Sequence, residues 1–377
     1  VFFNAFFRKR GVFVIISAVI AEFNPFHEGH RRLFLKMREK SDAIIAIMST
    51  HFVQRGDCAV YPKAIRAGDA VLGGADLVID LPCVYALSSA EHFSEGAVRT
   101  LDACGCVDKL FFGSECGDIK LLSRAAEAEL CGGAEFEREL KKKLSDGLSY
   151  ARARAEALSE YGEVLKSPNN ILGVEYIKAL NKIHSAIKPF TIKREGGGYN
   201  DASPDVFLPS ATAIRAKLKE SRGAGSVFIE DFDEIFAAAV KTASTEDLMS
   251  VPDCNREIAA RVKKAADKNT FEEICLGALC KRYPLSRIRR IIINLAIRNR
   301  FRVSPLPQYI RPCAFNKKGA EILRIIKSGA NLPVADRGAD IKGSDIFALE
   351  CRAADIYNLV QKKEGGAEYR ETPVKIF

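Results

Sequence analysis

Short runs rich in β-branched residues alternate with amphipathic stretches from Val12 to about Glu195, and this alternation constrains the fold more than any other feature of the chain. Strands are predicted at residues 12–21, 43–48, 76–81, 107–112 and 186–193. Helices are predicted between them, at residues 28–40, 63–73, 86–103, 118–161 and 170–182. Strands that alternate with helices are joined by right-handed crossovers, so we expect an α/β fold with an open parallel sheet covered on both faces. Ligands of such sheets bind at the carboxyl ends of the strands.

The pattern changes beyond Gly225. A Gly-rich stretch at 196–204 predicts a loop, and a helix is predicted over 211–221. Residues 229–302 then predict several helices broken at two prolines, and the end of the chain shows no clear pattern. The length also favours two domains. We expect a leader of unknown role at residues 1–11, an α/β domain over 12–225 and a mainly α-helical domain over 226–377.

The apolar stretch of the first predicted strand also resembles a secretory signal, because Arg8, Lys9 and Arg10 precede it. The stretch is too short to span a bilayer, and cleavage near Ala21 would remove the motif that follows. The 11 cysteines include no CxxC pair, so they predict reduced thiols of the kind found in cytosolic proteins. We therefore interpret the stretch as a buried strand and expect a cytoplasmic protein with no membrane partner.

Directly after this strand comes the sequence EFNPFHEGH, residues 22–30, at the start of a predicted helix. A helix N-terminus presents unpaired N–H groups and a positive dipole end, which favour phosphate. Gly29 lets phosphate approach the backbone, and His27 and His30 lie on one helical face, where both can donate hydrogen bonds to it. We predict these histidines as the catalytic residues of an adenylyl transfer; the alternative is two surface histidines. No protein-bound metal is expected, because the i, i+4 spacing of HExxH is absent.

A second set of polar residues follows the later strands and could face the same phosphate. Ser210, Thr212 and Arg215 combine hydroxyls at a helix start with a guanidinium one turn on. The alternative interpretation is an ordinary helix cap followed by a solvated arginine. Asn169 and Asn170 begin a predicted helix and could recognise adenine or ribose through their amides, or simply cap that helix. Arg194 ends the fifth strand, where a cation would meet phosphates. Four residues after the second strand could bind phosphate or RNA, or could instead be solvated surface groups, namely Gln54, Arg55, Lys63 and Arg66.

The net charge of +9 has its clearest concentration between residues 281 and 302, a segment with eight basic residues and no acidic one. Apolar residues recur within it at helical spacing, namely Ile288, Ile291, Ile292 and Leu295. They would pack inward and leave an arginine-rich face that can neutralise RNA phosphates, although a solvated charge run is the alternative. The residues predicted to bind RNA are Lys281, Arg282, Arg287, Arg289, Arg290 and Arg298.

The string F-N-P-x-H-x-G-H resembles the nucleotide-binding motif of the HxGH nucleotidylyltransferase superfamily, which has a Rossmann-like sheet. Further strings resemble the bacterial tRNA(Met) cytidine acetate ligase family, in order along nearly the whole chain. They are IAEFNPFHEGH at 20–30, MSTHFVQRG at 48–56, KAIRAGDAVLGGADLVIDLP at 63–82, FGSE at 112–115, SPNNILGVEYIKAL at 167–180, LPSATAIR at 208–215 and YIRPCAFNKKG at 309–319. The family pattern reads MSGNFVQRG where this chain has Thr50 and His51.

The resemblance implies an enzyme that uses ATP, with Mg²⁺ as its counterion, to activate acetate as acetyl-adenylate, and that then acetylates N4 of the wobble cytidine of elongator tRNA(Met). The helical domain and its basic segment would hold the tRNA. The implied ATP site comprises Ile20, Ala21, Glu22, Phe23, Asn24, Pro25, Phe26, His27, Glu28, Gly29, His30, Gly113, Asn169, Asn170, Arg194, Ser210, Thr212 and Arg215. Two alternatives are a nucleotidylyltransferase that adenylylates a small phosphorylated cofactor precursor, and a non-catalytic RNA-binding protein on a nucleotide-binding scaffold.

Overall fold

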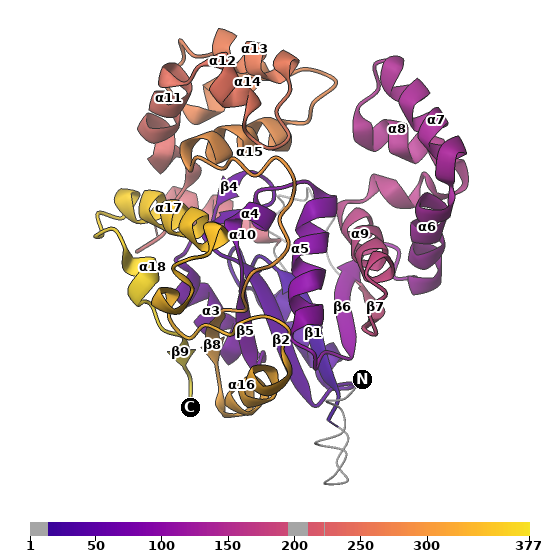
Figure 1. The fold of residues 1–377 in the computed structure, drawn as a ribbon, viewed down its shortest axis with the longest axis vertical. Helices are drawn as coiled ribbons and strands as arrows, with labels where there is room; N and C mark the ends of the chain where they lie inside the picture. Colours follow the sequence, from indigo (N-terminus) through magenta and orange to yellow (C-terminus); the bar gives the residue numbers. More distant parts are fainter. Residues whose placement is uncertain (1–13, 195–209, 222) are drawn as a thin grey trace.

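The computed structural model of the chain describes residues 14–194, 210–221 and 223–377 (Figure 1). Three predictions lie wholly or partly outside these ranges: the leader at 1–11, the first two residues of the predicted strand 12–21, and the loop at 196–204.

A seven-stranded sheet in the order β7-β6-β1-β2-β5-β8-β9 forms the centre of the molecule (Figure 1). The first five strands in this order are parallel, as predicted. Their bounds are β1 Ile16–Ala21, β2 Ala43–Ser49, β5 Leu77–Leu81, β6 Lys109–Ser114 and β7 Lys188–Lys193. Every residue of β2 and β5 is buried, because a parallel sheet is covered on both faces and leaves its central strands no solvent.

Helices cover the two faces of the sheet. Phe34 and Met37 of α2 (Glu28–Arg38) and Val71 of α3 (Lys63–Leu72) belong to the apolar cluster on one face. The larger cluster on the other face includes residues of α5 (Ala90–Ala103), α9 (Pro168–Lys182) and α16 (Lys317–Gly329). The helix predicted over 86–103 starts later, at Ala90 of α5, and a separate short helix, α4 (Cys83–Ala86), precedes it. The predicted insert 118–161 forms α6 Ile119–Cys131, α7 Gly133–Ser145 and α8 Tyr150–Ala157.

Five helices lie beyond the carboxyl ends of the parallel strands, at the top of Figure 1. They are α11 Asp233–Thr242, α12 Thr245–Met249, α13 Arg256–Lys264, α14 Phe271–Ala278 and α15 Leu285–Ala296, and α10 (Ala211–Ser221) precedes them. The two predicted breaks are present, since α12 ends shortly before Pro252 and α15 follows Pro284 directly. A proline lacks the N–H that a helix interior requires.

The end of the chain returns to the sheet, which the sequence pattern does not predict. Strand β8 (Pro312–Phe315) pairs antiparallel with β5, and β9 (Val374–Lys375) pairs with β8. Helices α17 (Asp345–Val360) and α18 (Ala367–Arg370) lie between these strands in the chain. The division near residue 225 stays a prediction, but residues beyond it contribute both to the helical part and to the sheet.

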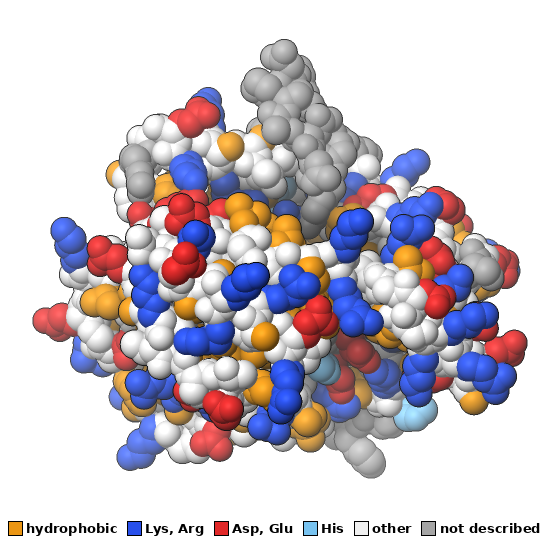
Figure 2. Space-filling model, turned by 90° about the horizontal axis from the view of Figure 1, so that it is seen from above, with side chains coloured by type: hydrophobic (Ala, Val, Ile, Leu, Met, Phe, Trp, Pro, Cys, Tyr) orange, Lys and Arg blue, Asp and Glu red, His pale blue; other side chains and the backbone are white. Residues whose placement is uncertain are grey.

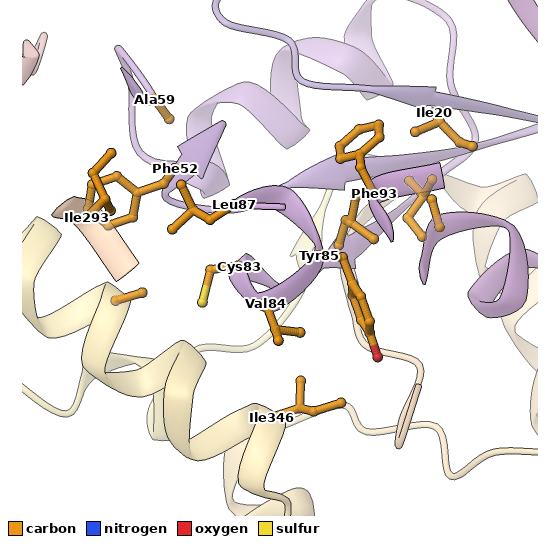
Figure 3. Packing of buried hydrophobic residues seen from close by; sticks show 14 of the residues in the cluster. Ile20, Phe52, Ala59, Cys83, Val84, Tyr85, Leu87, Phe93, Ile293 and Ile346 are labelled. Carbon is orange, nitrogen blue, oxygen red and sulfur yellow. The ribbon is translucent and has the colours of Figure 1, made fainter. Parts of the chain in front are cut away.

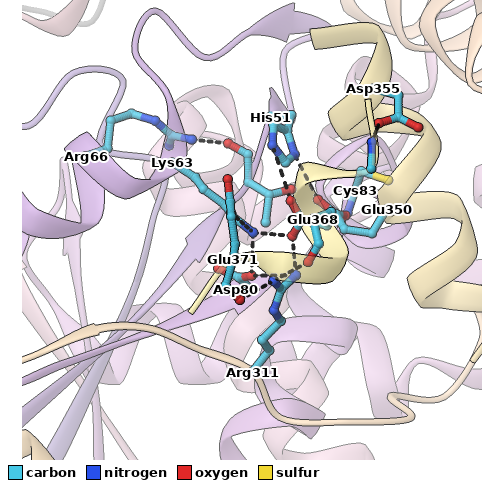
Figure 4. A network of polar contacts seen from close by, with 12 residues as sticks. His51, Lys63, Arg66, Asp80, Cys83, Arg311, Glu350, Asp355, Glu368 and Glu371 are labelled. Carbon is cyan, nitrogen blue, oxygen red and sulfur yellow. Dashed lines mark hydrogen bonds and ion pairs between the residues drawn. The ribbon is translucent and has the colours of Figure 1, made fainter. Parts of the chain in front are cut away.

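Buried charges fasten this C-terminal segment to the sheet (Figure 4). Lys63 pairs with Glu368 of α18, and its Nζ lies 3.2 Å from an oxygen of Asp80 and 3.2 Å from one of Glu371. Arg311 also pairs with Glu368. Burial alone would raise the pKa of Glu368, but the two cations lower it to about 2. Lys63 therefore neither faces solvent nor binds phosphate or RNA; its charge is used inside the fold.

Arg66 of α3 is fully buried, so it is not a solvated surface group either. Its guanidinium donates hydrogen bonds to four carbonyl oxygens, those of Tyr61, Glu22, Ser49 and Thr50. Because Glu22 and Ser49 lie at the ends of β1 and β2, Arg66 fixes the edge of the sheet at which a ligand would bind.

Lys63→Met removes one of the two cations, Lys63 and Arg311, that pair with Glu368 and Asp80 in a buried site. We expect the free energy of unfolding to fall by about 3–5 kcal/mol, since one partner of a buried ion pair is lost. Urea denaturation of the unliganded protein measures this change. Lys142→Met, at an exposed position of α7, should change it by less than about 0.5 kcal/mol. Equal effects of the two substitutions would contradict the role of the buried network.

Candidate active site

A cavity of about 290 Å³ opens at the carboxyl ends of β1, β6 and β7. Its wall contains most of the ATP-site residues that the resemblance implies: Ile20, Ala21, Glu22, Phe23, Asn24, His27, Gly29, His30, Gly113, Asn169, Arg194, Ser210, Thr212 and Arg215. Segments separated by almost 200 residues of sequence therefore meet at one place.

The two histidines are fixed by the backbone at the start of α2. His27 is the N-cap residue, and its Nδ1 accepts a hydrogen bond from the Gly29 N–H at 3.0 Å. The Nδ1 of His30 accepts one from the His27 N–H at 3.3 Å. The rings stack with their centroids 3.9 Å apart. Since Nδ1 is an acceptor in both rings, each neutral imidazole carries its proton on Nε2 and has that N–H left to donate to a ligand.

Gly29 makes room for the His27 ring in this turn. A β-carbon at residue 29 would lie 2.8 Å from Cε1 of His27, closer than real contacts allow. The absence of a side chain at residue 29 therefore keeps the His27 ring over the helix terminus, with Nδ1 in reach of the backbone.

Both imidazoles are neutral at pH 7. Burial lowers the pKa of His27 to about 4, and the guanidinium groups of Arg194 and Arg215 act in the same direction. Burial also lowers the pKa of His30 well below its ordinary value, with smaller contributions from His27 and Arg194. A polyanion in the cavity would meet two cationic guanidinium groups and two neutral N–H donors.

The two arginines are held by neighbouring polar groups. Arg215 donates to the carbonyl oxygen of Asn24 at 2.8 Å and to Oγ1 of Thr212 at 3.3 Å. Arg194 donates to Oδ1 of Asn169 at 3.3 Å. Oγ of Ser210 accepts from the Ala213 N–H at 3.2 Å, as a helix cap does. Ser210 therefore both caps its helix and lies in the cavity wall.

Four residues of the implied ATP site do not line the cavity. Asn170 is buried, and its Oδ1 accepts from the N–H groups of Glu115 and Cys116 at 3.0 and 3.2 Å, so its amide shapes the loop after β6. Pro25 is buried, Phe26 packs near Phe23 and Phe34, and Glu28 is exposed and 3.8 Å from Arg32. Their contact with nucleotide stays a prediction.

A two-stranded hairpin that the sequence pattern does not predict forms another part of the wall. It consists of β3 (Phe52–Val53) and β4 (Asp57–Cys58), joined by a turn. Val53, Gln54, Arg55 and Asp57 line the cavity, as do the apolar side chains of Phe93, Phe112, Leu172 and Tyr176. The hairpin strands are too short to give a periodic signal, so the sequence pattern does not reveal them.

The basic segment, residues 281–302, comprises α15 and the residues on either side of it. Ile288, Ile291, Ile292 and Leu295 are buried, as their spacing predicts. Its charges have counterions, which the sequence interpretation missed because the acids belong to other helices. Arg289 pairs with Glu272, Arg282 lies 3.5 Å from Glu257, and Arg300 lies 3.2 Å from Asp247. Figure 2, which views the molecule from the side of α11–α14, shows basic side chains interspersed with acidic ones.

The six residues predicted to bind RNA differ in exposure. Lys281, Arg282 and Arg298 are exposed. Arg287 and Arg289 are half-buried, and Arg287 donates twice to the Asp253 carbonyl oxygen. Arg290 is buried. Arg290 therefore cannot contact RNA without a rearrangement, whereas the exposed residues can.

Within the described ranges, no three or more His, Cys, Asp or Glu side chains are grouped so that they could hold a metal ion. None of the helices in these ranges is long and apolar enough to cross a membrane. The 11 cysteines are free thiols, and most of them are buried or half-buried.

A family model described as HIGH Nucleotidyl Transferase matches residues 15–227 and 220–371. Similar curated proteins include the tRNA(Met) cytidine acetate ligase of Caldanaerobacter subterraneus subsp. tengcongensis, 36% identical over 383 residues that cover 91% of this chain and 95% of that protein. Another is the tRNA(Met) cytidine acetate ligase of Acetivibrio thermocellus, 33% identical over 94% of this chain and 98% of that protein.

Solved structures of Thermotoga maritima TmcAL have the same fold. The apo form I matches with a TM-score of 0.90 at 30% identity, over 96% of this chain and 99% of that one. The form II structure, with α-thio ATP bound, matches with a TM-score of 0.88 over the same shares.

The lowered pKa of His27 predicts a pH-dependent stability. In the unfolded chain the pKa is about 6.5, whereas in the folded protein it is about 4. The unfolded state therefore binds more protons between these values, and the free energy of unfolding should fall as the pH drops from about 6.5 to about 4. His27→Asn keeps a capping side chain but does not titrate, so it should lose less stability over that range. Urea denaturation at several pH values measures the free energy of unfolding of both proteins. If the two proteins lose the same stability as the pH drops, the lowered pKa of His27 is not its cause.

Proposed function

This chain belongs to the tRNA(Met) cytidine acetate ligase family, and we propose that it catalyses an ATP-dependent acetylation of elongator tRNA(Met) at N4 of the wobble cytidine. The observation that carries the proposal is the pairing of two Nε2–H donors with two guanidinium groups around one cavity. A site of this kind fits the triphosphate of ATP and needs no covalent catalyst from the protein.

The first step activates acetate. An acetate oxygen attacks the α-phosphorus of ATP, the bond from that phosphorus to the bridging oxygen breaks, and pyrophosphate leaves with the electron pair. His27 and His30 would donate hydrogen bonds to oxygens on which negative charge increases, and Arg194 and Arg215 would balance the charge of the leaving group. Mg²⁺ would enter with ATP as part of the substrate.

The second step transfers the acetyl group. The exocyclic N4 amine of cytidine attacks the acetyl carbonyl carbon, the bond from that carbon to the phosphate oxygen breaks, and the amine loses a proton as AMP leaves. A base must leave the stack of its RNA loop to reach a reactive group in a cavity. The exposed Lys281, Arg282 and Arg298 are proposed to bind the tRNA backbone while this occurs. Action on tRNA also favours the cytoplasm as the proposed location.

Acetate-dependent exchange of pyrophosphate into ATP, measured without tRNA, tests the first step. We expect His27→Asn and His30→Asn each to lower its rate about 10²–10³-fold, the usual effect of losing one donor to a developing oxyanion. His184→Asn is a matched control, because His184 is exposed in a turn with a φ of 52° that Asn tolerates. It should retain the exchange rate of the unsubstituted protein.

Two results would overturn this assignment. Exchange that requires a small phosphate ester in place of acetate would favour the cofactor nucleotidylyltransferase. A protein that binds tRNA but turns over neither substrate would be the non-catalytic scaffold.

The tRNA surface has its own test. Lys281→Gln and Arg298→Asn each remove one exposed charge. We expect weaker tRNA binding in both, with the slope of log affinity against log salt reduced by about 1 per substitution. ATP affinity should not change. Filter binding at several salt concentrations measures the slope, and an unchanged slope would show that these residues lie outside the tRNA surface.

A further inference from the structure

The backbone of Gln54 joins two parts of the molecule that sequence analysis treats separately. Its carbonyl oxygen accepts a hydrogen bond from NH1 of Arg290, on α15, at 2.9 Å. Its N–H donates to Oε1 of Glu22, in the motif that follows β1, at 2.8 Å. Its side chain donates to the Ser88 carbonyl oxygen at 3.4 Å. One residue thus connects helix α15, the catalytic motif and the segment after α4.

The hairpin that carries Gln54 is also bound to the motif at its far end. Nδ2 of Asn24 donates to the Cys58 carbonyl oxygen at 3.1 Å, and Oδ1 of Asn24 accepts from the Val60 N–H at 2.7 Å. Between these attachments the hairpin places Val53, Gln54, Arg55 and Asp57 in the cavity wall. Its position therefore sets the shape of one side of the proposed ATP site.

On its other side the hairpin packs directly on α15. Gly56 has a φ of 72°, and a β-carbon there would lie 2.5 Å from Cβ of Arg289 and 2.8 Å from the backbone nitrogen of Arg290. No side chain can separate the two backbones at this point. A shift of α15 relative to the sheet would therefore be transmitted to the hairpin.

Helix α15 is itself well anchored near this contact. Nδ2 of Asn294 donates to the Leu87 carbonyl oxygen at 2.9 Å. Figure 3 shows Ile293 beside Phe52 of β3, with Leu87 close by, in the buried apolar cluster. The Arg290 side chain is only 8% exposed, and its nearest carboxylate oxygen, on Asp253, is 4.0 Å away. A buried guanidinium with so distant a counterion is costly to keep, and the Gln54 carbonyl is its close hydrogen-bond partner.

We infer that Arg290 is a positioning residue for the ATP site: through the Gln54 carbonyl it holds the β3–β4 hairpin in the cavity wall, and it does not contact RNA. The inference rests on the proposed function only for the identity of the nucleotide. It replaces the sequence-based prediction of Arg290 as a tRNA ligand. Arg290 belongs to the basic segment in sequence but to the nucleotide site in space.

Arg290→Met tests this role, because it removes the donor and keeps most of the side-chain volume. We expect the Kd of ATP, measured by calorimetry without acetate or tRNA, to rise about ten-fold, the effect of losing one hydrogen bond of a charged group. The KM for ATP in pyrophosphate exchange should rise by the same factor with a smaller change in kcat, and tRNA affinity should stay within about two-fold. Arg290→Lys, which keeps a cationic donor, should recover part of the ATP affinity.

Two further variants separate positioning from general destabilisation. Arg261→Met removes a part-exposed guanidinium of α13, paired with Glu257, and should leave the Kd of ATP unchanged. Gly56→Ala forces the hairpin away from α15 without touching any charge, and should raise the Kd of ATP as Arg290→Met does. In the double variant the two effects should not add, since both displace the same hairpin.

Two results would overturn the inference that Arg290 positions the hairpin. If Arg290→Met weakens tRNA binding and leaves the Kd of ATP unchanged, Arg290 is an RNA ligand. If Arg290→Met does not fold, Gly56→Ala decides alone, and an unchanged Kd of ATP refutes the role of the hairpin. Failure of the proposed function would appear differently: the unsubstituted protein would bind ATP but show no acetate-dependent exchange.

Discussion

The turn between β1 and α2 is held by hydrogen bonds from several elements, and the geometry of the site depends on it. Arg66 of α3 binds the Glu22 carbonyl, Arg215 of α10 binds the Asn24 carbonyl, and the Asn24 side chain binds the segment after β4. Within this frame α2 can start abruptly at His27, so that backbone N–H groups occupy both Nδ1 atoms and leave both Nε2–H groups for a ligand. The donors are therefore oriented before any substrate binds, which is the condition for efficient charge stabilisation.

The C-terminal part of the chain completes the sheet. Its strands β8 and β9 extend the parallel strands, and the pairs of Glu368 with Lys63 and Arg311 lie inside that junction. His51, which differs from the family pattern, belongs to the same region, because its Nδ1 lies 3.0 Å from Oε1 of Glu350. The difference at residue 51 thus changes a contact between the segment after β2 and α17. It does not add a side chain to the cavity wall, since residue 51 does not line it.

The sequence predicts the parts of this structure that depend on local pattern. The five predicted parallel strands are confirmed. Their continuous apolar runs are predictable because strands of a parallel sheet are buried on both faces. The motif at residues 22–30 is found at a strand-to-helix turn, because its residue types suit a helix N-terminus. The strands β8 and β9 escape prediction, since they are short and pair with residues far away in sequence. The burial of Arg290 is not predicted for a related reason, since it depends on the hairpin, which no local pattern reveals.

The central claim is that an acetate oxygen attacks the α-phosphorus of ATP in this cavity. The most direct test is to supply acetate labelled with ¹⁸O in both oxygens, together with ATP and tRNA, and to measure the mass of the AMP released. Attack at the α-phosphorus leaves one acetate oxygen on that phosphorus when the acetyl group is transferred, so the AMP should contain one ¹⁸O atom. AMP without the label, or ADP as the product, would contradict the account.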